Sequence, residues 1–308
     1  MRAQTLRFGV IGAGYLGRHH ARIYSALAQE TQLELAAVCD MDAARAREVA
    51  ETYGTGFFTD YRQILPMVDA VSIVTPTASH YEVAMGCLRA GKDVLLEKPI
   101  CATMREAGEV LELAREKGLI LQAGHVERYN PAAGKALSMV ERPLFIEAQR
   151  TSPFPERSLD VDVTLDMMIH DIDLALNALG CPEVRDIKAA GARIITPNLD
   201  TAQAWVDFEN DCSAFFSVSR VAAEKKRVIE FIERGRVVKA DLLAGKVALK
   251  TRDFEGEVET GPAEPLREEL ADFARCVKTR TAPRVSPLEA RRALELALRI
   301  SEIIRSVS

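Results

Sequence analysis

The chain has 308 residues, of which 48% are hydrophobic and 28% charged, and its net charge is −5. This length predicts two domains of ordinary size, and the composition is typical of a soluble globular protein. The acidic net charge argues against nucleic-acid binding, and no Lys/Arg run suggests it. No apolar stretch approaches the ~20 residues of a membrane span, so none is expected.

The first expected elements are a strand at residues 8–11 and a helix that begins directly after a glycine turn. The turn is Gly12-Ala13-Gly14-Tyr15-Leu16-Gly17. This pattern is typical of a loop that holds a dinucleotide pyrophosphate. Gly12 permits the tight turn, Gly14 lets the backbone approach phosphate, and Gly17 lets the helix lie against the strand. The N–H groups and positive dipole end of the helix would then face the anion.

A second apolar run at residues 33–39 ends at Asp40, close to the spacing of roughly 20 residues expected for the acid that binds the adenosine ribose. Its carboxylate can accept from both ribose hydroxyls and would repel a 2′-phosphate. We therefore expect NAD rather than NADP, although Arg45 and Arg47 are suited to such a phosphate. The alternative for Asp40 is a turn or N-cap residue before a helix expected at residues 41–52.

Strand-like runs and helical patterns alternate up to residue 125. After the first two strands we expect a short run at 56–59, helices at 60–65, 79–90 and 104–117, and strands at 69–74, 94–97 and 120–123. This rhythm predicts a doubly wound parallel sheet, here assigned to residues 1–124. Ligands of such sheets bind at the carboxyl ends of the strands.

Polar side chains follow two of these strands. Thr75 and Pro76 leave the strand at 69–74, and Lys98 follows the strand at 94–97, which ends at Glu97. Lys98 can donate to a substrate oxygen and stabilise developing alkoxide character. The alternative is a solvated surface lysine. The proline that follows Lys98 makes a cis peptide plausible.

Three histidines in this half are given lesser roles. His80, in the helix after Pro76, is expected to pack or cap rather than react. His19 and His20, in the first helix, are expected to be structural or to lie beside the cofactor.

Beyond about residue 130 the pattern changes. Extended runs are expected at 145–151, 186–195, 202–208, 213–218, 228–233 and 247–251, with helices at 165–179, 266–278 and 287–307. Partial alternation of polarity predicts a mostly antiparallel sheet. We assign residues 125–308 to this second domain, with C-terminal helices that can pack back on the first.

The helix at 165–179 carries the strongest acid–base candidates. Helical spacing places Asp166, His170 and Asp173 on one face. A histidine between carboxylates can take a proton from an alcohol while one carboxylate fixes its tautomer. The alternatives are a core histidine and a divalent metal site that uses Asp162, Asp166 and His170.

Further polar groups are candidate substrate ligands. Arg128, Tyr129 and Asn130 leave the sixth strand near the predicted cleft and offer donors to a polyhydroxylated ligand. Arg150 and Arg157 could grip a phosphate; ordinary surface arginines are the alternative.

Cysteine usage and the N-terminus indicate the compartment. Six cysteines are scattered without a CxxC or metal-ligand spacing, which is typical of reduced thiols. The first strand begins within a few residues of the N-terminus, which leaves no room for a signal peptide. We expect a cytoplasmic protein and no metal.

Nearly the whole chain resembles the Gfo/Idh/MocA family of sugar and inositol oxidoreductases. The matching elements occur in family order: Gly12-x-Gly14-x-x-Gly17, Asp40, Thr75-Pro76 with His80, Glu97-Lys98-Pro99, and Asp166-x-x-x-His170-x-x-Asp173. The resemblance implies an N-terminal Rossmann domain that binds NAD and a C-terminal α/β domain with an open, largely antiparallel sheet. That sheet commonly forms the interface of a homodimer or homotetramer.

By resemblance, Lys98 contacts substrate and nicotinamide, His170 is the general acid/base, Asp166 is its neighbour in the substrate site, and Asp173 binds substrate. The cofactor-binding residues are then those of the glycine turn with Asp40, Thr75, Pro76, His80, Glu97 and Lys98. Met168 stands where the family often has glycine, which affects local packing. The segment 124–132 is similar to a subgroup, the UDP-N-acetylglucosamine 3-dehydrogenases. The sequence thus predicts an NAD-dependent dehydrogenase of a sugar hydroxyl, most simply a nucleotide sugar. A free-sugar or inositol dehydrogenase and a non-catalytic NAD-binding regulator are the alternatives.

Overall fold

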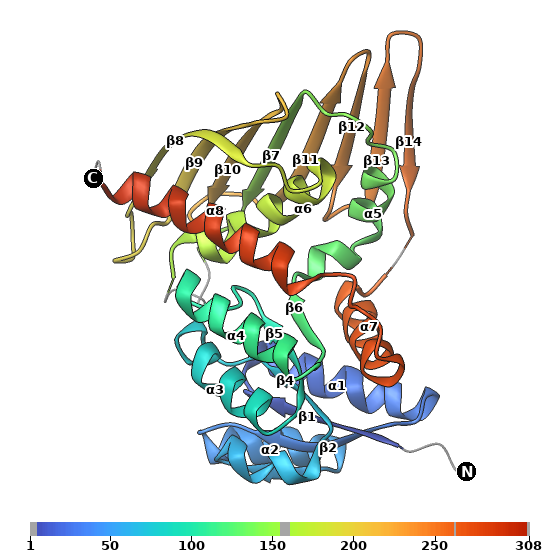
Figure 1. Cartoon of the computed structure of the whole chain (residues 1–308). Helices are drawn as coiled ribbons and strands as arrows, with labels where there is room; N and C mark the ends of the chain where they lie inside the picture. Colours follow the sequence, from blue (N-terminus) through green and yellow to red (C-terminus); the bar gives the residue numbers. More distant parts are fainter. Residues whose placement is uncertain (1–4, 155–160, 262, 307–308) are drawn as a thin grey trace. The chain divides into compact units, whose positions relative to one another are not determined.

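The computed structural model describes residues 5–154, 161–261 and 263–306. The chain divides into two compact units (Figure 1). Unit 1 comprises Met1–His125 and Leu266–Arg291, and unit 2 comprises Val126–Pro265 and Arg292–Ser308. No helix in these described ranges is both long enough and apolar enough to cross a bilayer.

Unit 1 contains the predicted doubly wound sheet, and this prediction is confirmed. Its six parallel strands lie in the order β3-β2-β1-β4-β5-β6. They span Leu6–Ile11 (β1), Leu33–Cys39 (β2), Gly56–Phe58 (β3), Ala70–Ile73 (β4), Asp93–Glu97 (β5) and Leu121–Gly124 (β6). The strand order reverses between β1 and β4, and ligands of such sheets bind at this switch point.

Helices of unit 1 connect the strands and cover the sheet. They are Tyr15–Glu30 (α1), Ala43–Tyr53 (α2), Thr77–Arg89 (α3), Met104–Glu116 (α4) and Pro265–Thr279 (α7). α7 comes from the far end of the chain, yet its Phe273 packs edge-on against Phe8 of β1, with ring centroids 5.8 Å apart. The amide of Gln122 also donates to the carbonyl of Glu269 in α7.

The prediction of one helix in unit 1 is wrong. Residues 60–65 form part of two short 3₁₀ turns, Tyr61–Gln63 and Leu65–Met67, rather than one helix. Pro66 explains the second of these, because proline lacks an N–H and is tolerated only in a first turn.

Unit 2 is built on an eight-stranded sheet in the order β14-β13-β12-β11-β7-β10-β9-β8. Its strands span Phe145–Thr151 (β7), Val184–Ala192 (β8), Thr201–Phe208 (β9), Ser213–Ser219 (β10), Lys226–Glu233 (β11), Arg236–Asp241 (β12), Lys246–Thr251 (β13) and Glu255–Glu259 (β14). All neighbouring strands are antiparallel except β7 and β10. The predicted mostly antiparallel sheet is confirmed, although the sequence analysis missed β12 and β14.

One face of this sheet is covered within unit 2. Figure 1 shows α5 (Pro131–Leu137), α6 (Ile169–Leu179) and α8 (Pro287–Ser306) on the same side of it. Alternate residues of β9 and β10 are buried, whereas Trp205 between them is 40% exposed. The ring of Trp205 lies 5.1 Å from that of Phe145 and 6.4 Å from that of Phe215. The opposite face therefore carries an aromatic cluster of Phe145, Trp205 and Phe215.

Candidate active site

The glycine turn of unit 1 has the geometry that a pyrophosphate needs. Gly12 has φ +99°, and a Cβ there would lie 2.6 Å from the carbonyl oxygen of Val74. A Cβ on Gly17 would lie 1.8 Å from the carbonyl oxygen of Gly12. Gly14 is the N-cap of α1, and no side chain caps this helix. Because a Cβ on Gly14 would meet no described atom within 4 Å, the helix N-terminus is open to an anion.

Asp40 lies beside this turn. Its Oδ2 accepts from the backbone N–H of Ala13 at 2.7 Å, and its Oδ1 accepts from that of Asp42 at 2.9 Å. The N-cap interpretation of Asp40 is wrong, since the side chain that caps α2 is Asp42. The guanidinium of Arg45 stands 3.6 Å from Asp40. This carboxylate at the end of β2 suits the ribose that NAD presents next to its pyrophosphate.

The neighbours of the turn differ in exposure. Tyr15 is largely exposed and its ring lies edge-on to His19, whereas Leu16 is half-buried. Thr75 follows β4, and its hydroxyl accepts from Ser79 at 2.8 Å. Pro76 is the N-cap of α3.

His80 is buried, as expected of a packing residue, and its ring faces two backbone carbonyls. Nε2 lies 2.8 Å from the oxygen of Thr75, and Nδ1 lies 2.9 Å from the oxygen of Pro99. Burial lowers the pKa of His80, and both carbonyls offset part of that effect. The side chain thus joins the segments that follow β4 and β5.

Glu97 ends β5 and Lys98 follows it, and the peptide between Lys98 and Pro99 is cis, as predicted. Lys98 is half-buried. The carboxylate of Glu97 is buried, lies 3.4 Å from Nε2 of His20 and accepts from the Lys98 N–H at 3.2 Å. Burial raises the pKa of Glu97, but His20 and Lys98 outweigh it and bring that pKa below its ordinary value.

In unit 2 the acid–base candidates do not lie on one regular helix. Thr164–Met168 form a wider π turn, and α6 begins only at Ile169. Asp166 and His170 are half-buried, whereas Asp173 is buried with Oδ1 3.6 Å from Nη1 of Arg128. Because a π turn changes the angular step between residues, the spacing rule for one α-helix does not hold across it. Such turns occur often at functional sites.

Arg150 does not have the predicted free guanidinium for a phosphate. It is buried and donates to both oxygens of Asp171 and to Glu127, at 2.7–3.1 Å. Arg227 also reaches Glu127, at 3.2 Å. Burial raises the pKa of Asp171 above its ordinary value despite Arg150, and it opposes the two arginines that lower the pKa of Glu127. Arg157 lies outside the described residues.

The other candidate substrate ligands are largely engaged within unit 2. The Asn130 side chain caps α5 through Ala132, and its amide nitrogen donates to Glu127 and to the carbonyl of Leu242. Tyr129 and Arg128 are buried.

The metal alternative finds no support in the ranges that the structure describes, where no three His, Cys, Asp or Glu side chains are grouped to hold an ion. Asp162 is bound by the guanidinium of Arg305 at 2.9 Å and by the N–H of Leu199 at 3.0 Å.

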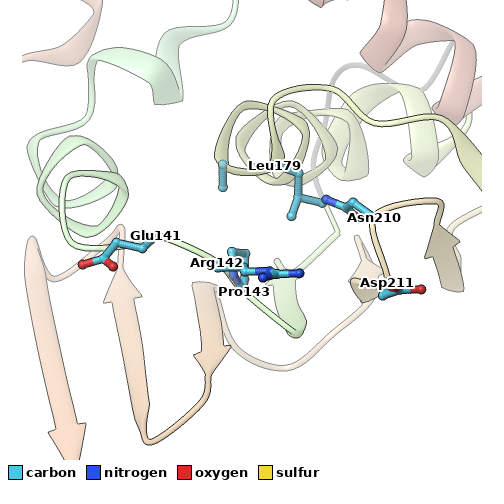
Figure 2. Close-up of a pocket in the computed structure, with 7 residues that line it drawn as sticks. Glu141, Arg142, Pro143, Leu179, Asn210 and Asp211 are labelled. Carbon is cyan, nitrogen blue, oxygen red and sulfur yellow. The ribbon is translucent and has the colours of Figure 1, made fainter.

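A hollow of about 270 Å³ in unit 2 is lined by Glu141, Arg142, Pro143, Ala178, Leu179, Asn210 and Asp211 (Figure 2). None of the predicted site residues lines it. Leu179 is the last residue of α6 and His170 lies in its first turn, so the two are roughly 13 Å apart along the axis. The hollow is thus at the wrong end of α6 to include His170.

Comparisons with known proteins agree with this arrangement. Residues 6–125 match the model of an oxidoreductase family with an NAD-binding Rossmann fold, and residues 141–238 match the GFO/IDH/MocA C-terminal domain. The UDP-N-acetylglucosamine 3-dehydrogenase of Acidithiobacillus ferrooxidans is 35% identical over 96% of both chains. The scyllo-inositol 2-dehydrogenase (NAD(+)) of Bacillus subtilis is 26% identical over 98% of this chain and 94% of its own.

Solved structures share the fold. That of the Acidithiobacillus ferrooxidans enzyme superposes with a TM-score of 0.93 over 99% of both chains. A levoglucosan dehydrogenase in complex with NADH has a TM-score of 0.87 at 18% identity, covering 99% of this chain and 98% of its own, which shows the fold alone.

Proposed function

The chain belongs to the GFO/IDH/MocA family of NAD-binding oxidoreductases, and we propose that it oxidises a secondary hydroxyl of a nucleotide sugar, namely C3 of UDP-N-acetylglucosamine. The observation that carries the substrate proposal is the 35% identity to a UDP-N-acetylglucosamine 3-dehydrogenase over 96% of both chains. The inositol dehydrogenase matches at lower identity and makes a free cyclitol the second candidate.

NAD supplies the hydride acceptor for such an oxidation. The residues proposed to hold it are Gly12 to Gly17 with the N-terminus of α1, Asp40, Thr75 and Pro76. The uncapped helix end offers N–H donors to the pyrophosphate, and Asp40 offers acceptors to the ribose hydroxyls. A negative carboxylate at this point disfavours NADP.

The proposed chemistry divides between two side chains. His170 removes the proton of the sugar hydroxyl, with Asp166 as its neighbour in the substrate site. Lys98 donates to a substrate oxygen and stabilises developing negative charge while hydride leaves the carbon. Arg128, Tyr129, Asn130 and Asp173 are the proposed substrate-side residues, and Nη1 of Arg128 lies 3.6 Å from Oδ1 of Asp173.

The test is a panel of sugars incubated with the protein and NAD, followed by the absorbance of reduced nicotinamide. We expect turnover with UDP-N-acetylglucosamine and strong inhibition of that turnover by UDP. Turnover of free N-acetylglucosamine or myo-inositol should be small or absent. Turnover of the free compounds without inhibition by UDP would favour the inositol-type alternative. Absence of reduction across the panel would favour an NAD-binding regulator.

A variant separates catalysis from cofactor binding. Lys98→Met should lower kcat by about 10²–10³-fold, the size measured for removal of one donor to a developing oxyanion. The Kd for NAD should stay unchanged. Full turnover of the variant would remove Lys98 from the mechanism.

We also propose that the aromatic face of the eight-stranded sheet joins copies of the chain into a dimer or tetramer in the cytoplasm. Partly exposed Trp205 lies beside Phe145 and Phe215 there, with tilted rings, and contiguous apolar surface of this kind marks interaction sites. All six cysteines are thiols, which agrees with a reducing compartment. Trp205→Lys should yield monomers in sedimentation velocity; an unchanged assembly would exclude this face.

A further inference from the structure

We propose that two buried histidines, His20 and His80, are positioning residues for Lys98. The inference rests on the role proposed for Lys98 above. Each histidine holds one chain neighbour of the lysine: His20 contacts the carboxylate of Glu97, and His80 contacts the carbonyl of Pro99. The sequence analysis gave both histidines only a packing or cofactor-adjacent role.

His80 anchors the residue that follows Lys98. Its ring is 1% exposed and lies between the carbonyl oxygens of Pro99 and Thr75, at 2.9 and 2.8 Å. Carbonyl oxygens only accept, so the neutral ring donates to one of them and the imidazolium donates to both. The ring lies between two segments that leave adjacent parallel strands, β4 and β5. The imidazolium bonds both segments, and the neutral ring holds Pro99 in the tautomer that carries the proton on Nδ1.

His20 anchors the residue that precedes Lys98. It is 0% exposed on α1, the helix that begins at the glycine turn, and its Nε2 is 3.4 Å from Oε1 of Glu97. The other oxygen of Glu97 accepts from the backbone N–H of Lys98 at 3.2 Å. Gly124 pairs with Glu97 across the strands, and a Cβ there would lie 2.8 Å from the carboxyl carbon. The carboxylate is thus confined by an imidazole, a backbone N–H and a glycine.

These anchors matter because lysine is a point charge on a flexible four-carbon stem. The backbone at Lys98 determines where that stem starts, and a displacement of about 1 Å can cost about 10²-fold in rate. The charged groups that face the anchors are Glu97 and Lys98. Loss of either histidine should therefore displace the ammonium and leave the pyrophosphate turn in place.

Two pairs of variants separate anchoring from packing. Leucine at position 20 or 80 fills the buried volume without a donor, whereas glutamine keeps N–H groups that can reach the same oxygens. We expect His20→Leu and His80→Leu to lower kcat by about 10- to 100-fold with the Kd for NAD unchanged. The two glutamine variants should retain most of the rate. Val49→Ala, a core substitution in α2, is the control for lost stability and should keep full kcat.

Gly124→Ala offers a third perturbation that leaves both histidines intact. Its added methyl group displaces the Glu97 carboxylate, so kcat should fall as in His20→Leu. If leucine proves as good as glutamine at both positions, or if Val49→Ala loses as much rate at an equal loss of thermal stability, the anchoring proposal is overturned.

Backbone hydrogen exchange at Lys98 provides a readout that needs no substrate. In the folded protein the Lys98 N–H is bonded to Glu97. We expect its exchange to accelerate in His20→Leu and in Gly124→Ala but not in Val49→Ala. Should the wild type reduce no NAD with any sugar, the proposed function fails, and accelerated exchange would still support the His20 anchor. Unchanged exchange in both variants would refute that anchor whatever the substrate.

Discussion

In unit 1 the candidate side chains are bonded largely to backbone groups, whereas in unit 2 they adjoin buried ion pairs. Asp40 accepts from the Ala13 N–H, and His80 faces two backbone carbonyls. In unit 2, Asp171, next to His170 in the chain, is held by the guanidinium of Arg150. The sequence separations are similar, 27 residues for Asp40 with Ala13 and 21 for Arg150 with Asp171, so the units differ in the kind of partner: a backbone group in unit 1 and a buried charge in unit 2. The two units should therefore respond differently to substitution.

The largest expected effect comes from His170, the proposed base in unit 2. His170→Asn should lower kcat by about 10²–10⁴-fold, the contribution typical of a positioned general base. The Kd for NAD, which depends on the glycine turn of unit 1, should not change. Single-turnover kinetics with titration calorimetry would measure both. Asn177→Gln, two turns further along α6, is the matched control and should turn over normally; the same normal rate in His170→Asn would contradict the assignment.

The next largest effect concerns the ion pairs of unit 2. Arg150→Met leaves the buried carboxylates of Asp171 and Glu127 without their main partner, which should lower the free energy of unfolding by about 3–5 kcal/mol. The single tryptophan, Trp205, lies in unit 2 and reports its unfolding in urea.

The control for Arg150 is an exposed ion pair in the same unit. Arg185 contacts Asp211 at 3.1 Å on the surface, and Arg185→Met should leave the urea midpoint nearly unchanged. Equal losses of unfolding free energy in Arg150→Met and Arg185→Met would mean that the buried ion pairs contribute no more to stability than the exposed pair.

Asp200 should make the stability of unit 2 depend on pH. It is buried against Arg220 at 2.9 Å and accepts from the N–H groups of Ile195 and Thr196. Burial raises the pKa of Asp200, but these donors outweigh it and hold the pKa well below its ordinary value. A depressed carboxyl pKa stabilises the folded state above the unfolded value, and this stabilisation is lost as pH falls below about 4.

The Trp205 unfolding transition should therefore lose about 2–3 kcal/mol of stability between neutral pH and strong acid on account of Asp200 alone. In Asp200→Asn, the loss should already be present at neutral pH, and the remaining dependence on pH should be shallower. A variant with the wild-type pH dependence would show that this carboxylate does not govern acid stability.

The smallest effect is expected in unit 1. Asp40→Ser removes the charge at the end of β2 and should weaken NAD binding by about 10- to 100-fold, since a hydrogen bond to a charged group contributes about 1.5–3 kcal/mol. The Kd for NADP divided by the Kd for NAD should decrease, because the preference for NAD is reduced. Asp42→Ser keeps a competent cap on α2 and should leave both constants unchanged. If Asp40→Ser and Asp42→Ser bind NAD alike, Asp40 is not the ribose ligand.

Much of unit 1 could be predicted from the sequence because its signals are local. The glycine turn, Asp40 and the polar ends of β4 and β5 each follow an apolar strand directly. The contact of His20 with Glu97 was not predicted, because Glu97 lies far along the chain and no spacing within α1 indicates this contact. Gly124 could be placed at the carboxyl end of its strand, but its need for a missing Cβ arises only from the register with Glu97.

Unit 2 was less predictable because more of its contacts are formed only in the folded chain and leave no local sequence pattern. The sequence analysis took Arg150 for a surface arginine or a phosphate ligand because nothing local indicates its partners, Asp171 and Glu127. The π turn at Thr164–Met168 was also missed, since its residues have the apolar pattern of an ordinary helix. A regular period over Asp166 and Asp173 suggested one shared face, and only Asp166 and His170 remain accessible.

The central claim is that hydride passes from a nucleotide-linked sugar to NAD. UDP-N-acetylglucosamine labelled with deuterium at C3 of the sugar tests it directly, because the transferred isotope can be found by mass spectrometry of the reduced cofactor. We predict one deuterium in the nicotinamide ring for each 3-keto sugar formed. Reduced cofactor without deuterium, or no reduced cofactor at all, would contradict the claim.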